Sequence, residues 1–251
     1  MGQALLGGLL ASGWNASEIT VVEVDVKKSA EVHKNFGVAV SNEIVACDGA
    51  IIAVKPGAVV EVCAKLRHVG VSRVLSIAAG ISTSAMQDAL GTNAAVIRSM
   101  PNTPALVREG ASAITGSSSC SEADLQWAES ILRAVGIVVR VDEKDIDAVT
   151  AVAGSGPGYL FLFAEALIDA AITEGLSPET ATSLVRQLFK GTGALYASSQ
   201  EDASTLRAQV TSPGGTTAAG LGVFNDSGVR EIVKQAVHAA KERSREMGEG
   251  K

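Results

Sequence analysis

Residues 49–56, with the sequence GAIIAVKP, decide the fold class. The run is apolar on both faces that an extended chain presents and is rich in branched side chains, as strands buried in parallel sheets are. The proline at its end is well suited to the first turn of a helix. The stretch therefore predicts a buried strand over Gly49–Val54 that leads directly into a helix over Ala58–Arg67.

The same pattern of strand and helix repeats on both sides of this stretch. Further strands are predicted at Ile19–Val24, Arg73–Ile77, Ala95–Arg98, Ala111–Thr115 and Ile137–Val141. The other helices are predicted at Gln3–Ser12, Lys27–Phe36, Thr83–Leu90 and Glu122–Ala134. Glycines occupy the expected C-terminal caps, at Gly13, Gly37, Gly70, Gly91 and Gly136. Strands separated by helices of this size predict a doubly wound α/β domain over residues 1–142.

The strand pattern stops after Asp142, and the remaining residues read as helical. A long helix is predicted over Pro157–Glu174, followed by four more that end near Glu246 and by a frayed polar tail from Lys241. The long helix is apolar over most of its circumference, which indicates burial on several sides. Because a domain of this size cannot provide that cover alone, we expect a partner subunit.

Composition narrows the function. The chain has 251 residues, and its hydrophobic share of 47% excludes global disorder. Its net charge of −6 offers no basic surface to nucleic acid. The longest apolar run, residues 159–172, contains Glu165 and Asp169 and falls short of the ~20 residues that cross a membrane. Three cysteines without CxxC spacing predict neither disulfides nor a metal site and fit a cytoplasmic protein.

The beginning of the chain lacks one expected element. Residues 1–10, MGQALLGGLL, read as the end of a G-x-G-x-x-G turn that runs into its helix, with Gly2 as the last glycine. The fold is thus a Rossmann-like doubly wound sheet that lacks its first strand, which is central in this fold. We expect a misplaced start or a shortened chain. The alternative is a chain that folds without the strand and has altered cofactor affinity.

Three loops are predicted at the carboxyl ends of the strands, where ligands of open α/β sheets bind. The first loop, residues 53–56, carries a lysine that favours phosphate. The second, residues 76–80, carries small residues that let a flat ring or ribose approach the backbone. The third, residues 100–104, carries an asparagine between two prolines. Alone, each loop could equally reflect close packing or a solvated side chain. Together they predict a cofactor cleft that includes Ala53, Val54, Lys55, Pro56, Ala78, Ala79 and Asn102.

Glu23 and Asp25 lie at the end of the second strand of such a sheet. An acid there commonly binds the ribose hydroxyls of a dinucleotide and repels a 2′-phosphate. No arginine follows, although Lys27 and Lys28 are near, so the pattern leans towards NADH. The alternative is a pair of solvated acids.

Residues 211–220, TSPGGTTAAG, form the most specific segment. Its glycines uncover backbone N–H groups just before a helix, and such a helix start binds carboxylate or phosphate. Thr217 adds a hydroxyl that can donate a hydrogen bond to a ring nitrogen or accept one from it. The alternative is a helix cap and a tight turn without a ligand.

These motifs together resemble the pyrroline-5-carboxylate reductase family over nearly the whole chain. The resemblance rests on AVKP at 53–56, SIAAG at 76–80, MPNTP at 100–104, GSGP at 154–157 and VTSPGGTT at 210–217. It implies a dinucleotide-binding domain over residues 1–142 and a helical dimerisation and substrate domain over residues 143–251. It also implies the last step of proline biosynthesis, reduction of (S)-1-pyrroline-5-carboxylate to L-proline by NADPH or NADH, in homodimers that assemble into a larger homo-oligomer.

The resemblance also assigns roles to single residues. It places Gly2, Asn42, Val54, Lys55, Ala79 and Gln209 at the cofactor. It places Ser212, Thr216 and the catalytic Thr217 at the substrate, across a dimer interface. From the residues themselves we expect the amides of residues 215–217, beginning at Gly215, to hold the substrate carboxylate. The missing strand and the lack of an arginine after Glu23 are departures from the family. The first puts the coenzyme affinity in question, and the second leaves the choice between NADH and NADPH open.

Two other functions are considered. A β-hydroxyacid dehydrogenase-like reductase shares this two-domain layout, but it needs a proton donor, usually a lysine near the start of the long helix. No lysine lies between Ala148 and Glu174. The second alternative is a non-catalytic oligomeric relic that lost its cofactor site with the first strand.

Overall fold

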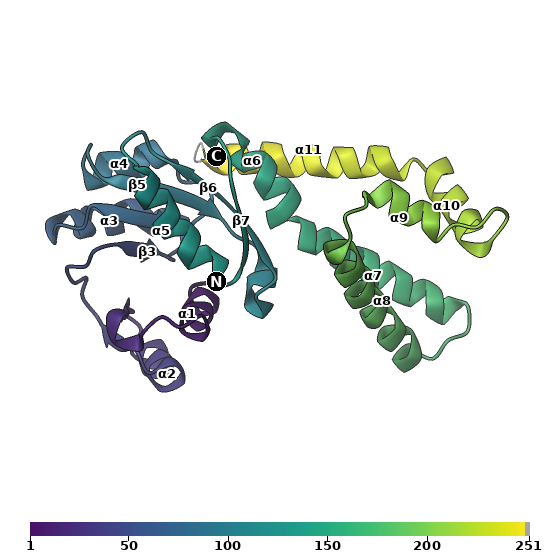
Figure 1. The fold of residues 1–251 in the computed structure, drawn as a ribbon, viewed down its shortest axis with the longest axis horizontal. Helices are drawn as coiled ribbons and strands as arrows, with labels where there is room; N and C mark the ends of the chain where they lie inside the picture. The colour runs from purple at the N-terminus through teal and green to yellow at the C-terminus, as the bar shows by residue number, and fades with distance from the viewer. Residues whose placement is uncertain (249–251) are drawn as a thin grey trace. The chain divides into compact units, whose positions relative to one another are not determined.

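The computed structural model describes residues 1–248, which form two compact units (Figure 1). The first comprises Met1–Ser155 together with residues 239–248, and the second comprises Gly156–His238. The first unit contains every described strand, and the second is helical. The predicted fold class, an α/β sheet followed by helices, is confirmed.

The sheet of the first unit is in two pieces. Strand β1 (Thr20–Val22) pairs in parallel with β2 (Ala39–Ser41). The second piece has the order β3-β4-β5-β6-β7 and consists of Ala50–Ile52, Arg73–Ser76, Ala95–Met100, Gly110–Gly116 and Gly136–Arg140. The first strand of a doubly wound sheet would lie between β1 and β3, and residues 1–248 place no strand there.

Two features of the sheet differ from the sequence-based expectation. Strand β2 was not predicted, because its sequence Ala-Val-Ser contains one branched apolar residue, whereas the equally short β1 lies in a longer run of such residues. Strands β5 and β6 pair antiparallel, although the strands all read as parallel. They are joined by a short 3₁₀ turn, Thr103–Val107, and not by the crossover helix that parallel neighbours need.

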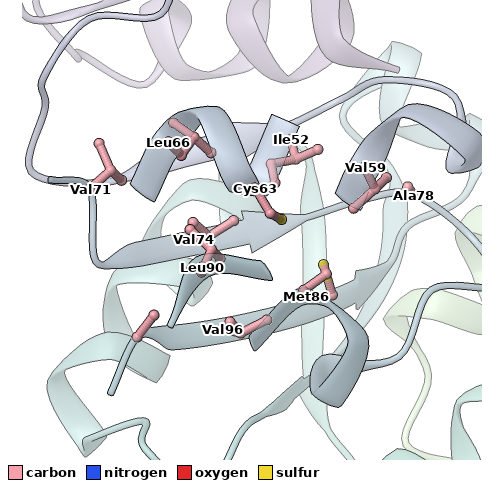
Figure 2. Packing of buried hydrophobic residues seen from close by; sticks show 11 residues of the cluster. Ile52, Val59, Cys63, Leu66, Val71, Val74, Ala78, Met86, Leu90 and Val96 are labelled. Carbon is pink, nitrogen blue, oxygen red and sulfur yellow. The ribbon is translucent and has the colours of Figure 1, made fainter. Parts of the chain in front are cut away.

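Helices cover both faces of the five-stranded sheet. Because successive strand residues point to opposite faces, Val74 and Val96 pack with α3 (Val59–His68) and α4 (Thr83–Leu90), as Figure 2 shows. Their neighbours Leu75 and Ile97 pack on the other side with α1 (Gly2–Ala11) and α5 (Glu122–Arg133). The core therefore lies in two layers.

Cys63 of α3 belongs to the cluster shown in Figure 2 and is completely buried. Burial raises the pKa of its thiol to about 11. Such a thiol packs as a small apolar side chain and stays protonated at neutral pH.

Helix α1 also contributes to a separate apolar cluster beside the two-stranded piece of sheet. Leu5 and Leu9 pack under the five-stranded sheet, whereas Leu6 packs with Val32 of α2 (Val26–Phe36) and with Val38 near β2. The helix thus joins the two-stranded piece to the five-stranded piece.

The first unit also includes elements from beyond residue 142. A 3₁₀ turn over Glu143–Asp145 leads into α6 (Ile146–Val149) and a π-helical turn over Thr150–Gly154. The end of α11 (Val229–Gly248) returns here, and the buried Ser244 hydroxyl donates to Asp147 Oδ1 at 2.7 Å. The expected fraying from Lys241 is therefore wrong up to residue 248, and the rest of that tail lies outside the described residues.

The second unit consists of α7 (Gly156–Thr173), α8 (Pro178–Ser198), α9 (Ala203–Gln209), α10 (Thr216–Asp226) and the start of α11. Helix α7 has no buried residue. Its Phe161 and Leu162 side chains are 69% and 66% exposed. This helix is the expected apolar one, and within the described chain part of its apolar surface, including Phe161 and Leu162, is uncovered, whereas Phe163 packs against Phe224.

By length and composition alone, the helical run Glu143–Thr173 is long and apolar enough to cross a membrane. The expectation that no segment of the chain approaches such a span is wrong by this criterion. The helical run begins further towards the N-terminus than the predicted helix. It contains the two acids at 165 and 169 and still meets the criterion of length and composition.

Gly136 gives a test of the fold. It follows α5 at a φ of +150°, and a Cβ there would lie 1.9 Å from the carbonyl oxygen of Gly110. We expect Gly136→Ala to lower the free energy of unfolding by at least about 3 kcal/mol, because strain and backbone overlap add. Denaturant unfolding followed by circular dichroism measures the change.

Gly57→Ala is the matched control, because a Cβ added to Gly57 would have no atom within 4 Å and the φ there is not strained. We expect its stability to stay within about 0.5 kcal/mol of wild type. Equal stability of the two variants would contradict the described backbone packing.

Candidate functional site

The start of α1 lies against the end of β3. Met1 is the N-cap, and no side chain caps the helix, so the first-turn amides lack a side-chain partner. A Cβ on Gly2 would lie 3.2 Å from the Cβ of Ala53. An uncapped helix start with a bare backbone at its first residue suits a phosphate group.

The segment after β3 is exposed. Lys55 precedes a 3₁₀ turn over Pro56–Ala58, and its carbonyl oxygen accepts the Ala58 N–H at 3.0 Å. The side chains of Val54 and Lys55 are both exposed. This arrangement leaves the lysine ammonium available to a ligand at the carboxyl end of β3.

Glu23 and Asn42 follow the neighbouring strands β1 and β2. The Glu23 N–H donates to Ser41 O at 3.0 Å, so the two predicted residues are close along adjacent strand ends. Glu23 Oε1 accepts the Asp25 N–H at 3.0 Å. Asp25 itself caps α2 by accepting two amides, which gives it a structural role. Of the two acids, Glu23 is the better candidate for ribose.

The loop after β4 holds Ala78 and Ala79. The Ala78 side chain lies in the core of Figure 2, and its N–H donates to Ser76 Oγ at 3.3 Å. A ligand contact by Ala78 would therefore come from its carbonyl. Ala79 is half-buried, and Gly80 turns the chain at a φ of +76°.

The Asn102 side chain bonds within the protein through both of its polar atoms. Its Oδ1 accepts the Ala111 N–H at 2.8 Å, and its Nδ2 donates to Ala153 O at 3.1 Å. It thus ties the start of β6 to the π-helical turn. These two bonds fix the orientation of the amide and leave one N–H and one oxygen lone pair for a cofactor contact. The sequence does not reveal this structural role.

The second unit holds Gln209 and the segment from Ser212 to Thr217. Gln209 is the exposed last residue of α9. Gly215 is the N-cap of α10 without a side-chain bond, and its own N–H donates to Ser212 O at 3.0 Å. Thr216 and Thr217, in the first turn of α10, are exposed. The other predicted site residues all lie in the first unit.

Gly215 is needed at this bend for steric reasons. A Cβ there would lie 2.3 Å from Ser212 Oγ and 3.2 Å from Ser212 O. Because the Gly215 N–H is already used, the amides left for a ligand are those after it. The amides available to the substrate carboxylate are therefore those of the first turn of α10, from Thr216 onward, and not that of Gly215.

A buried polar cluster beside the loop after β4 was missed. Glu143 Oε1 accepts the Thr83 N–H at 2.8 Å and lies 3.3 Å from Arg98 Nη1. Glu143 Oε2 accepts a short hydrogen bond from the Thr83 hydroxyl. Thr83 and Arg98 are buried. Arg98, a charged residue inside the buried strand Ala95–Met100, was the one sequence signal for this cluster.

Comparison with known families gives two matches. Residues 143–247 match the model described as pyrroline-5-carboxylate reductase dimerisation. Residues 1–80 match the model described as NADP oxidoreductase, coenzyme F420-dependent. A pyrroline-5-carboxylate reductase from Pseudomonas aeruginosa is 39% identical over 256 residues, which cover 99% of this chain and 94% of the relative. A pyrroline-5-carboxylate reductase from Synechocystis is also 39% identical, and the match covers 99% of this chain and 95% of the relative.

Solved structures agree with these relatives. A pyrroline-5-carboxylate reductase from Coxiella burnetii superposes with a TM-score of 0.94 at 33% identity and covers 98% of this chain and 94% of that one. The Plasmodium falciparum enzyme, solved with NADP bound, superposes with a TM-score of 0.85 at 30% identity and covers 99% of this chain and 94% of that one. Similarity of this extent spans both units, and the chain belongs to the pyrroline-5-carboxylate reductase family.

Proposed function

We propose that this protein reduces (S)-1-pyrroline-5-carboxylate to L-proline with NADPH or NADH, the last step of proline biosynthesis. One observation carries the substrate assignment. The first turn of α10 has no side-chain cap and presents two exposed threonines directly after a glycine bend. An imino acid has a carboxylate and a ring nitrogen close together, and this helix start offers amides for the first and a hydroxyl for the second.

The amides of Thr216 and Thr217 bind the carboxylate in this proposal, and the positive end of the α10 dipole favours its negative charge. The Thr217 hydroxyl binds the ring nitrogen. Ser212 lies beside them and holds the bend through its carbonyl bond to Gly215. Thr217 is the residue in contact with the reacting C=N group.

The coenzyme is assigned to the first unit. The bare backbone at Gly2 and the exposed Lys55 suit its phosphates, Glu23 and Asn42 suit the ribose, and Ala79 suits a flat ring. Ala53, Val54, Pro56 and the carbonyl of Ala78 line the same strand ends, and the family resemblance also assigns the exposed amide of Gln209 to the coenzyme. When bound, the coenzyme supplies a hydride. In this proposal residues 1–142 bind the coenzyme and residues 143–251 serve the substrate and dimerisation, although residues 143–155 pack with the first unit.

The reaction needs no strong protein acid, because the substrate already contains a C=N bond that accepts hydride once its nitrogen is protonated. The chain's residues bind and orient, and orientation of two reactants can contribute ~7–11 kcal/mol. The β-hydroxyacid dehydrogenase alternative lacks its lysine, and family membership does not favour it or the non-catalytic relic.

We further propose that a second copy of the chain covers the apolar side chains of α7, and that dimers assemble into a larger homo-oligomer in the cytoplasm. Support comes from the match of residues 143–247 to a dimerisation family and from the exposure of Phe161 and Leu162. The acidic net charge of −6 gives no support to a nucleic-acid or membrane partner.

Thr217→Ala tests the catalytic assignment. We expect kcat/KM for pyrroline-5-carboxylate to fall roughly 10- to 100-fold, because one hydrogen bond to a charged group is lost. The coenzyme Kd should be unchanged, since Thr217 binds the other reactant. Coenzyme oxidation measures turnover, and nicotinamide fluorescence measures the Kd.

Thr217→Ser is the control for this experiment, because it keeps the hydroxyl and should retain most of the activity. Wild-type turnover in Thr217→Ala would refute the role of this residue. If the wild-type protein oxidises neither coenzyme in the presence of the imino acid, the proposed function itself is wrong.

Phe161→Asp tests the dimer assignment. A buried unpaired carboxylate at the subunit contact is costly, so we expect the oligomer to dissociate at micromolar protein concentration. Sedimentation velocity reports the mass. Val60→Asp, at a 47% exposed apolar residue of α3, should leave the mass unchanged. If the wild-type protein is already a monomer, the account of α7 fails.

A further inference from the structure

The loop from Ile77 to Ser82 connects β4 to α4 and contains the two alanines assigned to the coenzyme. Residues 1–142 hold both ends of this loop. The Ile77 N–H donates to Ile52 O at 3.1 Å, Ala78 and Ile81 pack in the core, and Ser82 Oγ accepts the Ala85 N–H at 3.2 Å. Residues beyond 142 add further contacts at the end of the loop and beside Gly80.

Glu143 braces the end of the loop. Its carboxylate accepts both the N–H and the hydroxyl of Thr83, the first residue of α4. A carboxylate at this position also interacts favourably with the positive end of the α4 dipole. Both donors belong to the residue that directly follows the loop, so Glu143 fixes the point at which the loop ends.

Arg98 gives the carboxylate a second partner and connects it to β5. The Arg98 side chain is only 10% exposed, and its Nη1 lies 3.3 Å from Glu143 Oε1. Asp142, Lys144 and Asp145 flank Glu143 on its own turn and are exposed. Because Arg98 is buried, loss of the carboxylate would leave a cation without its partner, which is strongly unfavourable. The geometry therefore holds Glu143 in one place.

The last turn of α11 lies close to the loop. A Cβ added to Gly80 would be 3.6 Å from the carbonyl carbon and oxygen of Met247, so the two segments are near neighbours. The bond from Ser244 to Asp147 anchors this turn to α6. Glu143 is therefore the residue beyond 142 that bonds directly to the end of the loop, and both segments belong to the first unit.

We propose that Glu143 is a positioning residue for coenzyme binding, which acts through Thr83 on the loop Ile77–Ser82. The assignment rests on the proposed function, because that function places the coenzyme at Ala79. Without the brace, the coenzyme must order the loop on binding, and this ordering cost appears as weaker affinity. The substrate residues at Ser212–Thr217 are on other elements and should not respond.

The test compares Glu143→Ala and Glu143→Gln with wild type in two measurements. The coenzyme Kd is measured by nicotinamide fluorescence, and amide hydrogen exchange is measured for residues 77–85. We expect Glu143→Ala to raise the Kd about tenfold or more, because charge-assisted hydrogen bonds are lost. Exchange in the loop and in the first turn of α4 should become faster.

Glu143→Gln keeps an oxygen for the Thr83 N–H but loses its charge, so we expect intermediate values. For both variants, the KM for pyrroline-5-carboxylate at saturating coenzyme should stay within about twofold of wild type. A general loss of stability would not produce this separation of the two ligands.

Glu122→Gln is the matched control. Glu122 is also an acid in the first turn of a helix, and it pairs with a strand arginine, Arg140, at 2.7 Å. Arg140 retains Glu129 as a partner, and neither residue belongs to the 77–82 loop. We expect this variant to match wild type in coenzyme Kd and in loop exchange.

The outcomes separate the two claims. If wild type binds neither coenzyme, the proposed function fails, and loop exchange still tests the brace. If Glu143→Ala only lowers the unfolding midpoint, with wild-type coenzyme Kd and loop exchange, Glu143 is a structural residue and the inference is overturned. Unchanged exchange at residues 77–85 overturns it in every case.

Discussion

The packing of α1 between two pieces of sheet is the constraint on which the rest of the first unit depends. Leu5 and Leu9 face one core and Leu6 faces another. Each buried leucine contributes roughly 1.5–3 kcal/mol, so the helix joins β1–β2 to β3–β7 by several kcal/mol of apolar burial without a strand between them. The same packing places the uncapped start of α1 beside Ala53. The position of the proposed phosphate site therefore follows from hydrophobic packing and not from a dedicated ligand side chain.

Polar contacts then set the loops at the strand ends. The Asn102 carboxamide ties β6 to the π-helical turn through its oxygen and its nitrogen, and Glu143 ties the start of α4 to β5. Both side chains connect residues 83–111 to the segment that begins the dimerisation match. The loops that we assign to the coenzyme are thus stabilised by residues that follow the coenzyme domain in sequence. This arrangement gives a physical reason why the two halves of the chain form one functional protein.

Much of the fold was predictable from local patterns. Helix α4 was predicted at its observed bounds, because Ser82 is a good cap and Gly91 ends the helix. Strand β2 and the antiparallel β5–β6 pair were missed, because neither the short Ala-Val-Ser segment nor strand direction leaves an apolar signature. The site motifs were visible as sequence, but the use of the Gly215 amide within the bend was not. The contact of Glu143 with Thr83 joins residues 60 positions apart, and the arginine in β5 hinted only that a polar partner exists, not which residue provides it.

The central claim is that this chain brings a reduced nicotinamide coenzyme and a cyclic imino acid together for direct hydride transfer. The most direct measurement uses coenzyme deuterated at the transferring position of the nicotinamide ring, with mass spectrometry and NMR of the product. The account predicts L-proline that carries one deuterium, at ring carbon 5. Proline without deuterium at that carbon, or no proline at all, would contradict it.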